Sequence, residues 1–193
     1  MPRIDNQKFY ANALKLHGSS AKGLNWTSSA HQSLRFDILL DLLPQDLSSF
    51  SLVDAGCGFG DFYFYLQANQ KSVKSYIGVD SVKEMCEVAS SQTSQKILHA
   101  DICKASIPNA DFYICSGALN ILTPFETVQF IQNCYNSSKK GFLFNVLHGE
   151  KESQTFNYLS TQKIKEIAKE LKVKQIIMKS DYLQNDITIG FFR

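Results

Sequence analysis

Four segments of this sequence place glycines, acids and small polar residues where a nucleoside-like ligand could bind. The first is Val53-Asp54-Ala55-Gly56-Cys57-Gly58-Phe59-Gly60. Glycines at alternate positions permit a sharp turn and let backbone N–H groups lie close to a bound molecule. We therefore expect a ligand to contact the backbone of this stretch, which we call the glycine loop.

The spacing of the glycine loop differs from that of dinucleotide-binding loops, which follow the pattern G-x-G-x-x-G and hold a pyrophosphate. The third glycine comes one residue early, and Asp61 occupies the place that it would have. Asp54 lies two residues before the first glycine, where its carboxylate would repel a pyrophosphate by on the order of 1 kcal/mol. The loop therefore favours a ligand that offers an amine cation.

The other three segments lie at the ends of later predicted strands. Asp80 comes twenty residues after Gly60 and can accept hydrogen bonds from two ribose hydroxyls. Asp101 can accept from an adenine amino group while Ile102 packs on the ring, and the small residues 115–118 let a ligand lie against backbone. A lone Asp is often only a helix cap and a glycine turn only a turn. The order of all four segments is what predicts a nucleoside site.

The elements that must position these residues alternate between strands and helices from about residue 50. Apolar strand patterns lie at residues 50–54, 75–80, 96–100, 110–115, 141–147, 174–179 and 186–192. Helical patterns lie at residues 61–69, 83–90, 124–135 and 160–171. This alternation predicts a single-domain, doubly wound α/β fold with a mainly parallel sheet. Ligands bind beyond the carboxyl ends of such strands, so the four segments should meet at one edge.

The first 45 residues differ from the rest because they contain helical patterns and no strand. We expect helices at about residues 6–17 and from Ser28 or Ser29 to Pro44. Residues 1–45 are therefore predicted to form a helical lid and part of an acceptor pocket, which Tyr10 and Trp26 could line. Residues 46–193 are predicted to form the core of the same domain.

Composition excludes several other classes. With 20 basic and 18 acidic residues the chain has no basic excess, so a nucleic-acid partner is not expected. The five cysteines are scattered and lack the spacing of metal or disulfide frameworks, so we expect no metal and buried free thiols. No apolar run is long enough for a membrane span or a signal peptide, which predicts a cytoplasmic location.

The glycine loop resembles the first motif of the class I S-adenosylmethionine-dependent methyltransferases. Three later stretches are similar to that family's second-strand, adenine-loop and fourth-strand motifs: YIGVDSVKEMCEVA, ILHADI and DFYICSGALNIL. The final NDITIGFF is similar to its antiparallel seventh strand. The resemblance covers about residues 36–193 and is strongest to small bacterial members of unassigned substrate. It implies a seven-stranded sheet of order 3-2-1-4-5-7-6 and S-adenosylmethionine as cofactor, with S-adenosylhomocysteine as product.

The resemblance also implies a set of cofactor contacts. Asp54 would lie near the methionine amino end, Asp80 would bind the ribose, Ser81 would lie at the adenosine edge, and Ser116 would lie beside the methionyl chain. Arg35, with Gln32 one helical turn earlier, could reach the cofactor carboxylate. The full set is Gln32, Arg35, Asp54, Ala55, Gly56, Gly58, Asp80, Ser81, Asp101, Ile102 and Ser116.

Methyl transfer from a sulfonium rests mainly on proximity and orientation, and a general base is needed only if the acceptor must lose a proton. The candidates for such a base or for acceptor contact are His148, Asn120 and Tyr182. Asn120 lacks the Asn-Pro-Pro-aromatic context of some nucleic-acid and amine methyltransferases. A small-molecule acceptor is favoured because no appended domain is recognised. A cofactor-binding module without transferase activity, an RNA or protein methyltransferase, and an oligomeric enzyme remain open.

Overall fold

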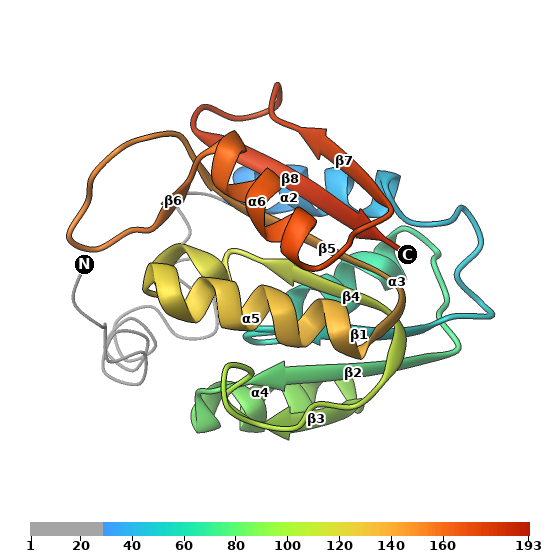
Figure 1. Cartoon of the computed structure of the whole chain (residues 1–193). Helices are drawn as coiled ribbons and strands as arrows, with labels where there is room; N and C mark the ends of the chain where they lie inside the picture. Colours follow the sequence, from blue (N-terminus) through green and yellow to red (C-terminus); the bar gives the residue numbers. More distant parts are fainter. Residues whose placement is uncertain (1–28) are drawn as a thin grey trace.

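An eight-stranded sheet forms the centre of the computed structural model, which describes residues 29–193 (Figure 1). Its strands are β1 (Ser51–Ala55), β2 (Ser75–Asp80), β3 (Lys96–His99), β4 (Ala110–Ser116), β5 (Ser138–His148), β6 (Tyr158–Leu159), β7 (Gln175–Lys179) and β8 (Asp186–Phe192). The helices are α2 (Ser29–Asp41), α3 (Asp61–Ala68), α4 (Lys83–Thr93), the short 3-10 helix η2 (Ala118–Ile121), α5 (Pro124–Ser137) and α6 (Thr161–Glu170).

The strand order is β3-β2-β1-β4-β5-β8-β7, and β8 runs antiparallel to both of its neighbours. This order confirms the predicted fold class, since β7 and β8 are the predicted sixth and seventh strands. The eighth strand, β6, was not predicted. It has two residues, too few to show an apolar alternation, and it pairs in parallel with Leu147 and His148 at the end of β5.

Helices cover both faces of the sheet, which explains the nearly continuous apolar runs of its central strands. Helices α2 and α3 pack on one face, and α5 and α6 cover the other (Figure 1). The α2 face buries Phe36, Leu39, Phe62, Leu66, Leu52, Ile114 and Leu143. The opposite face buries Phe130, Ile131, Ile164, Ile167, Tyr113, Phe142 and Phe144. Both layers hold the strand ends at fixed positions along one edge.

Local signals set the starts of the helices that follow the sheet's central strands. Thr123 and Glu126 form a reciprocal capping box at the start of α5, and Pro124 occupies the first turn. Ser160 caps α6 by accepting a hydrogen bond from the Lys163 N–H group. The α5 and α6 helices therefore begin close to their predicted positions.

The predicted lid is described only in part. Residues 1–28, with the predicted helix 6–17, Tyr10 and Trp26, lie outside the described residues, so the boundary between 1–45 and 46–193 stays a prediction. Within the described part, α2 is a layer of the core, because Phe36 and Leu39 are buried against the sheet.

The five cysteines, predicted to be buried free thiols, are all buried and none of them forms a disulfide within residues 29–193, which confirms that prediction. Between residues 29 and 193, no helix is long and apolar enough to cross a membrane.

Candidate functional site

The glycine loop turns sharply between β1 and α3, and its three glycines have positive φ angles of 78° (Gly56), 54° (Gly58) and 86° (Gly60). A Cβ atom added at Gly56 would overlap the Cβ of Ala118, which follows β4. The Gly56 and Cys57 N–H groups donate to the Val79 carbonyl at 2.7 and 3.1 Å. The loop therefore needs glycine at position 56 both for its conformation and for the close approach of two strand ends.

Asp80 is the last residue of β2, and its carboxylate binds the backbone of the glycine loop. Its Oδ2 accepts the Gly58 N–H at 2.9 Å and its Oδ1 accepts the Val82 N–H at 2.9 Å. Burial raises the pKa of Asp80, although backbone hydrogen bonds from Val82, Gly58 and Ser81 oppose the rise. A carboxylate has about four lone-pair sites, so Asp80 retains capacity for a further donor. A ribose hydroxyl fits that remaining capacity, and the residue is 8% exposed.

Asp54 is buried on the neighbouring strand β1 and accepts a hydrogen bond from the Tyr76 hydroxyl at 2.7 Å. Burial raises the pKa of Asp54 to about 7; the Tyr76 hydrogen bond lowers it, and the charges of Asp80 and Asp61 raise it further. The three carboxyl groups thus make this end of the sheet favourable for a cation. The ammonium and sulfonium groups of S-adenosylmethionine match that preference.

The predicted adenine contacts lie just after β3. Asp101 accepts the Cys103 N–H at 3.0 Å and pairs with Lys104 at 3.0 Å. Ile102 is buried in the core beside α5, and its carbonyl accepts from the Asn133 amide at 2.7 Å. Ser81 directly follows Asp80 and is half-buried. The structure places these residues beyond β2 and β3 as expected, and their contacts with adenine stay predictions.

Ser116 ends β4 and is held by a residue that sequence reasoning missed, Asn145 of β5. The Asn145 Oδ1 lies 3.3 Å from the Ser116 Oγ and 3.1 Å from the Gly117 nitrogen, and both groups donate to it. Asn145 lies in the apolar run GFLFNVL, where a single polar residue was the only available signal.

Gln32 and Arg35, predicted to reach the cofactor carboxylate, both have partners within the protein. Gln32 donates from Nε2 to the Asp61 Oδ2 at 2.9 Å, and Arg35 forms a buried ion pair with Asp186. The contact with the cofactor stays a prediction for both residues. The observed contacts join α2 to the start of α3 on one side and to the start of β8 on the other.

The three candidates for a base or acceptor contact also have structural partners. His148 Nε2 lies 3.0 Å from the Thr161 hydroxyl, and the Asn120 Oδ1 accepts the Leu147 N–H at 3.0 Å.

Tyr182 donates to Asp186 at 2.6 Å, and its hydroxyl also lies 2.7 Å from the Thr188 Oγ1. Burial, followed by the charge of Asp186, raises the pKa of Tyr182. Because that shift keeps its proton in place, Tyr182 is better suited to positioning than to proton removal.

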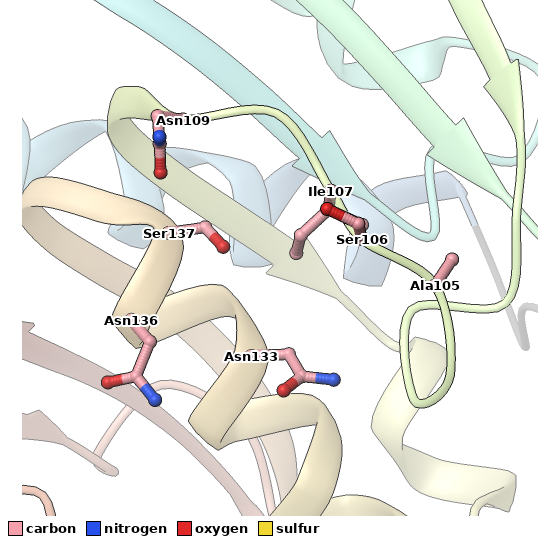
Figure 2. Close-up of a pocket in the computed structure, with 7 residues that line it drawn as sticks. All are labelled: Ala105, Ser106, Ile107, Asn109, Asn133, Asn136 and Ser137. Carbon is pink, nitrogen blue, oxygen red and sulfur yellow. The ribbon is translucent and has the colours of Figure 1, made fainter.

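Figure 2 shows a polar hollow that lies elsewhere, between the segment leading into β4 and the end of α5. It is lined by Ala105, Ser106, Ile107, Asn109, Asn133, Asn136 and Ser137. These residues lie toward the amino ends of β4 and β5, whereas the glycine loop and Ser116 lie at carboxyl ends. None of the predicted site residues lines this hollow.

Comparison with known proteins gives a consistent result. Residues 52–141 match the protein family described as a methyltransferase domain, a range that includes the glycine loop, Asp80 and Ser116. A provisionally assigned methyltransferase of Mycobacterium tuberculosis is 27% identical to this chain over an alignment of 152 residues, and the match covers 72% of this chain and 91% of that protein.

Two solved structures share the fold. The magnesium protoporphyrin IX methyltransferase of Synechocystis, solved with bound S-adenosylhomocysteine, has a TM-score of 0.72 and 14% identity, covering 97% of this chain and 95% of that one. A SAM-dependent methyltransferase of Leishmania major has a TM-score of 0.70 and 17% identity, covering 96% and 83%. The domain match, the relative and the shared fold together support an S-adenosylmethionine-dependent methyltransferase, with a methyltransferase domain matched over residues 52–141.

Proposed function

We propose that this methyltransferase acts on a small-molecule acceptor, by in-line displacement at the methyl group of S-adenosylmethionine. The observation that carries the proposal is the meeting of the glycine loop, Asp54 and Asp80 at the carboxyl ends of β1 and β2. The cofactor supplies an electrophilic methyl group when bound, so the protein has mainly to orient two molecules and exclude water.

Different residues of the chain bind different parts of the cofactor. Asp80 accepts from the ribose hydroxyls through its remaining lone pairs, and Asp54 faces the ammonium group. Ala55, Gly56 and Gly58 present backbone to the methionyl part, which Ser116 borders. Asp101, Ile102 and Ser81 bind the adenine and the adenosine edge.

The proposal also includes contacts of Arg35 and Gln32 with the cofactor carboxylate. These two contacts rest only on the sequence resemblance. A carboxylate there must compete with Asp186 for Arg35, or share it.

We place the acceptor side beyond β4 and β5, where the chain from Gly149 to Asn157 connects β5 to β6 and contacts η2. Asn157 anchors that return through its N–H group on the Asn120 carbonyl at 2.7 Å and its amide on the Thr127 hydroxyl at 2.8 Å. His148 borders this region and is the candidate general base, since histidine is the side chain that most often serves in that role. The near-neutral net charge supports a small acceptor over a nucleic acid.

Thermal-shift measurements test the cofactor. S-adenosylmethionine and S-adenosylhomocysteine should each raise the Tm of the protein, and NAD should not. Stabilisation by NAD alone would contradict the proposal at its first step.

Transfer of a labelled methyl group into a metabolite extract tests the acceptor. Label in a small product supports the proposal, while label only in added RNA or protein assigns a macromolecular acceptor. Binding of the cofactor without any labelled product favours a binding module.

A further inference from the structure

Asn145 is a buried polar residue in the middle of an apolar strand, and its contacts lead to the cofactor site. It is 0% exposed and lies on the face of β5 that packs against α2, two residues after the core residue Leu143. Its neighbours across the sheet are Ser116 on β4 and Thr188 on β8. Asn145 therefore lies beside the strand end that borders the methionyl chain in the proposed function.

The two ends of the Asn145 carboxamide are in different situations. The Oδ1 accepts from the Gly117 N–H at 3.1 Å and from the Ser116 hydroxyl at 3.3 Å. The Nδ2 is buried and has no hydrogen-bond partner among residues 29–193. The orientation of the group is set by Gly117, because a backbone N–H can only donate and so requires the oxygen.

Packing alone gives no reason for an amide at this position. A leucine has a similar volume, suits the apolar face on which Leu143 lies two residues earlier, and would remove the unpartnered Nδ2 donor; it would also deprive the Gly117 N–H of its acceptor. The favourable contribution of Asn145 comes from its oxygen, which holds the β4 turn at Ser116 and at Gly117, whose φ is 83°. Enzymes commonly keep residues that lower the stability of the fold slightly when those residues hold a functional turn in place.

We propose that Asn145 is a positioning residue of the methyl-transfer site. Its side-chain oxygen fixes the Ser116–Gly117 turn in the conformation that receives the methionyl part of the cofactor. This inference rests on the proposed assignment of Ser116 to the methionyl chain. It adds a residue from β5 to a site whose other predicted members follow β1 to β4 or lie on α2.

The experiment compares S-adenosylhomocysteine binding by calorimetry with thermal stability in three variants. Asn145→Leu removes the oxygen and should weaken binding by about tenfold, or about 1.4 kcal/mol, while Tm stays within about 3 °C of the parent. Asn145→Asp keeps an oxygen acceptor and is measured near pH 6, where burial favours the uncharged acid. It should bind within about threefold of the parent.

Ser138→Ala is the matched control, because Ser138 is a buried polar residue at the opposite end of β5 that bonds the Tyr135 carbonyl. It should leave the affinity within about twofold of the parent. Hydrogen exchange at the Gly117 amide gives a second readout: Asn145→Leu should accelerate it, which a packing role alone would not do.

Two results overturn the proposal. One is parent-like binding by Asn145→Leu, and the other is equally weak binding by Asn145→Asp, which would assign the role to the Nδ2 donor. If Asn145→Leu does not fold, Asn145→Ser, whose hydroxyl is too short to reach Gly117, is expected to show the same loss and is judged by the same criterion. Failure of the parent to bind S-adenosylhomocysteine would instead contradict the proposed function.

Discussion

Asp54 is buried, and burial makes its ionised carboxylate unfavourable unless a cation binds beside it. Burial raises its pKa from 3.8 to about 7, even with the Tyr76 hydroxyl bound to it. A raised carboxyl pKa means that the folded state favours the protonated form. The stability contributed by this group is therefore complete below pH 3.8 and is lost as pH rises through about 7.

This linkage predicts how stability responds to Asp54→Asn. The variant should unfold at a Tm higher than the parent's near pH 8, by about 2–4 °C for each 1 kcal/mol gained, with little difference near pH 4. Differential scanning calorimetry of the ligand-free proteins at both pH values measures the effect. Equal Tm differences at the two pH values would contradict the raised pKa.

The same group predicts a pH-dependent affinity. Because the cofactor ammonium requires an ionised Asp54, the Kd for S-adenosylhomocysteine should rise by up to about tenfold per pH unit below pH 7. In Asp54→Asn the affinity should be low and nearly independent of pH over that range. Calorimetric titrations from about pH 5.5 to pH 8 distinguish the two profiles.

Asp80 should be essential for binding because it holds the glycine loop through Gly58 and retains lone pairs for the ribose. Asp80→Ala should weaken S-adenosylhomocysteine binding by about tenfold or more, since hydrogen bonds to a charged group contribute about 1.5–3 kcal/mol each. Asp111→Asn is the matched control, as Asp111 bonds Ser51 at the opposite edge of the sheet. Unchanged affinity in Asp80→Ala would refute the ribose assignment.

Helix α2 connects the two sides of the site. Gln32 joins it to Asp61 at the start of α3, and Arg35 joins it to Asp186 at the start of β8. The Tyr182 hydroxyl shares Asp186 with Arg35. Helix α2 therefore sets the position of the glycine loop relative to the segment between β7 and β8, in addition to covering the sheet.

Breaking the buried pair should destabilise the protein strongly. Arg35→Met leaves Asp186 buried without its cation, so the free energy of unfolding should fall by about 3–5 kcal/mol. Adding Asp186→Asn should recover part of that loss, because the uncompensated charge is removed. Urea denaturation of the parent, the single and the double variant measures both effects, and an unchanged single variant would contradict the importance of the pair.

The double variant also tests the predicted contact between Arg35 and the cofactor carboxylate. If Arg35 binds the cofactor, Arg35→Met with Asp186→Asn should lose affinity for S-adenosylhomocysteine by about tenfold, even where stability is recovered. Calorimetric affinity equal to the parent's would leave Arg35 with the structural role alone.

Across the whole molecule, the strand order sets where the site lies. The chain passes from β3 at one edge to β4 beside β1, and this reversal of strand order is the place where open α/β sheets bind ligands. Gly56 follows β1 and Ala118 follows β4, and they approach so closely that no Cβ fits at Gly56. How closely these two loops approach is therefore set by the topology and by the missing side chain at Gly56.

Gly56→Ala should consequently impair binding more than stability. The added methyl group must push the β1 and β4 loops apart and also adopt a φ of 78°, so we expect an affinity for S-adenosylhomocysteine lower by about tenfold or more. Ala118→Gly in the same chain removes the overlap and leaves the strained φ, so it should restore part of the affinity. Calorimetry on both variants measures these affinities. If Ala118→Gly restores no affinity, the loss in Gly56→Ala is due entirely to the strained backbone conformation.

Local signals were enough to predict a candidate site. The alternate glycines, the acids at the ends of β1 and β2 and the acid after β3 form a pattern that is read within short windows, and a parallel sheet brings its carboxyl ends together without further information. Element positions were predicted for the same reason, since apolar periodicity is local. The strand β6 was not predicted because its two residues are too few to show an apolar periodicity.

The sequence by itself therefore determined the fold class and the cofactor, and it predicted the edge of the sheet where the cofactor binds. Only the tertiary structure decided the partners of the buried polar groups. Arg35 and Asp186 are 151 positions apart, and Asn145 meets Gly117 across 28. Such pairs form because desolvated polar groups must find partners wherever packing brings them, and that choice depends on the whole fold and on no local pattern.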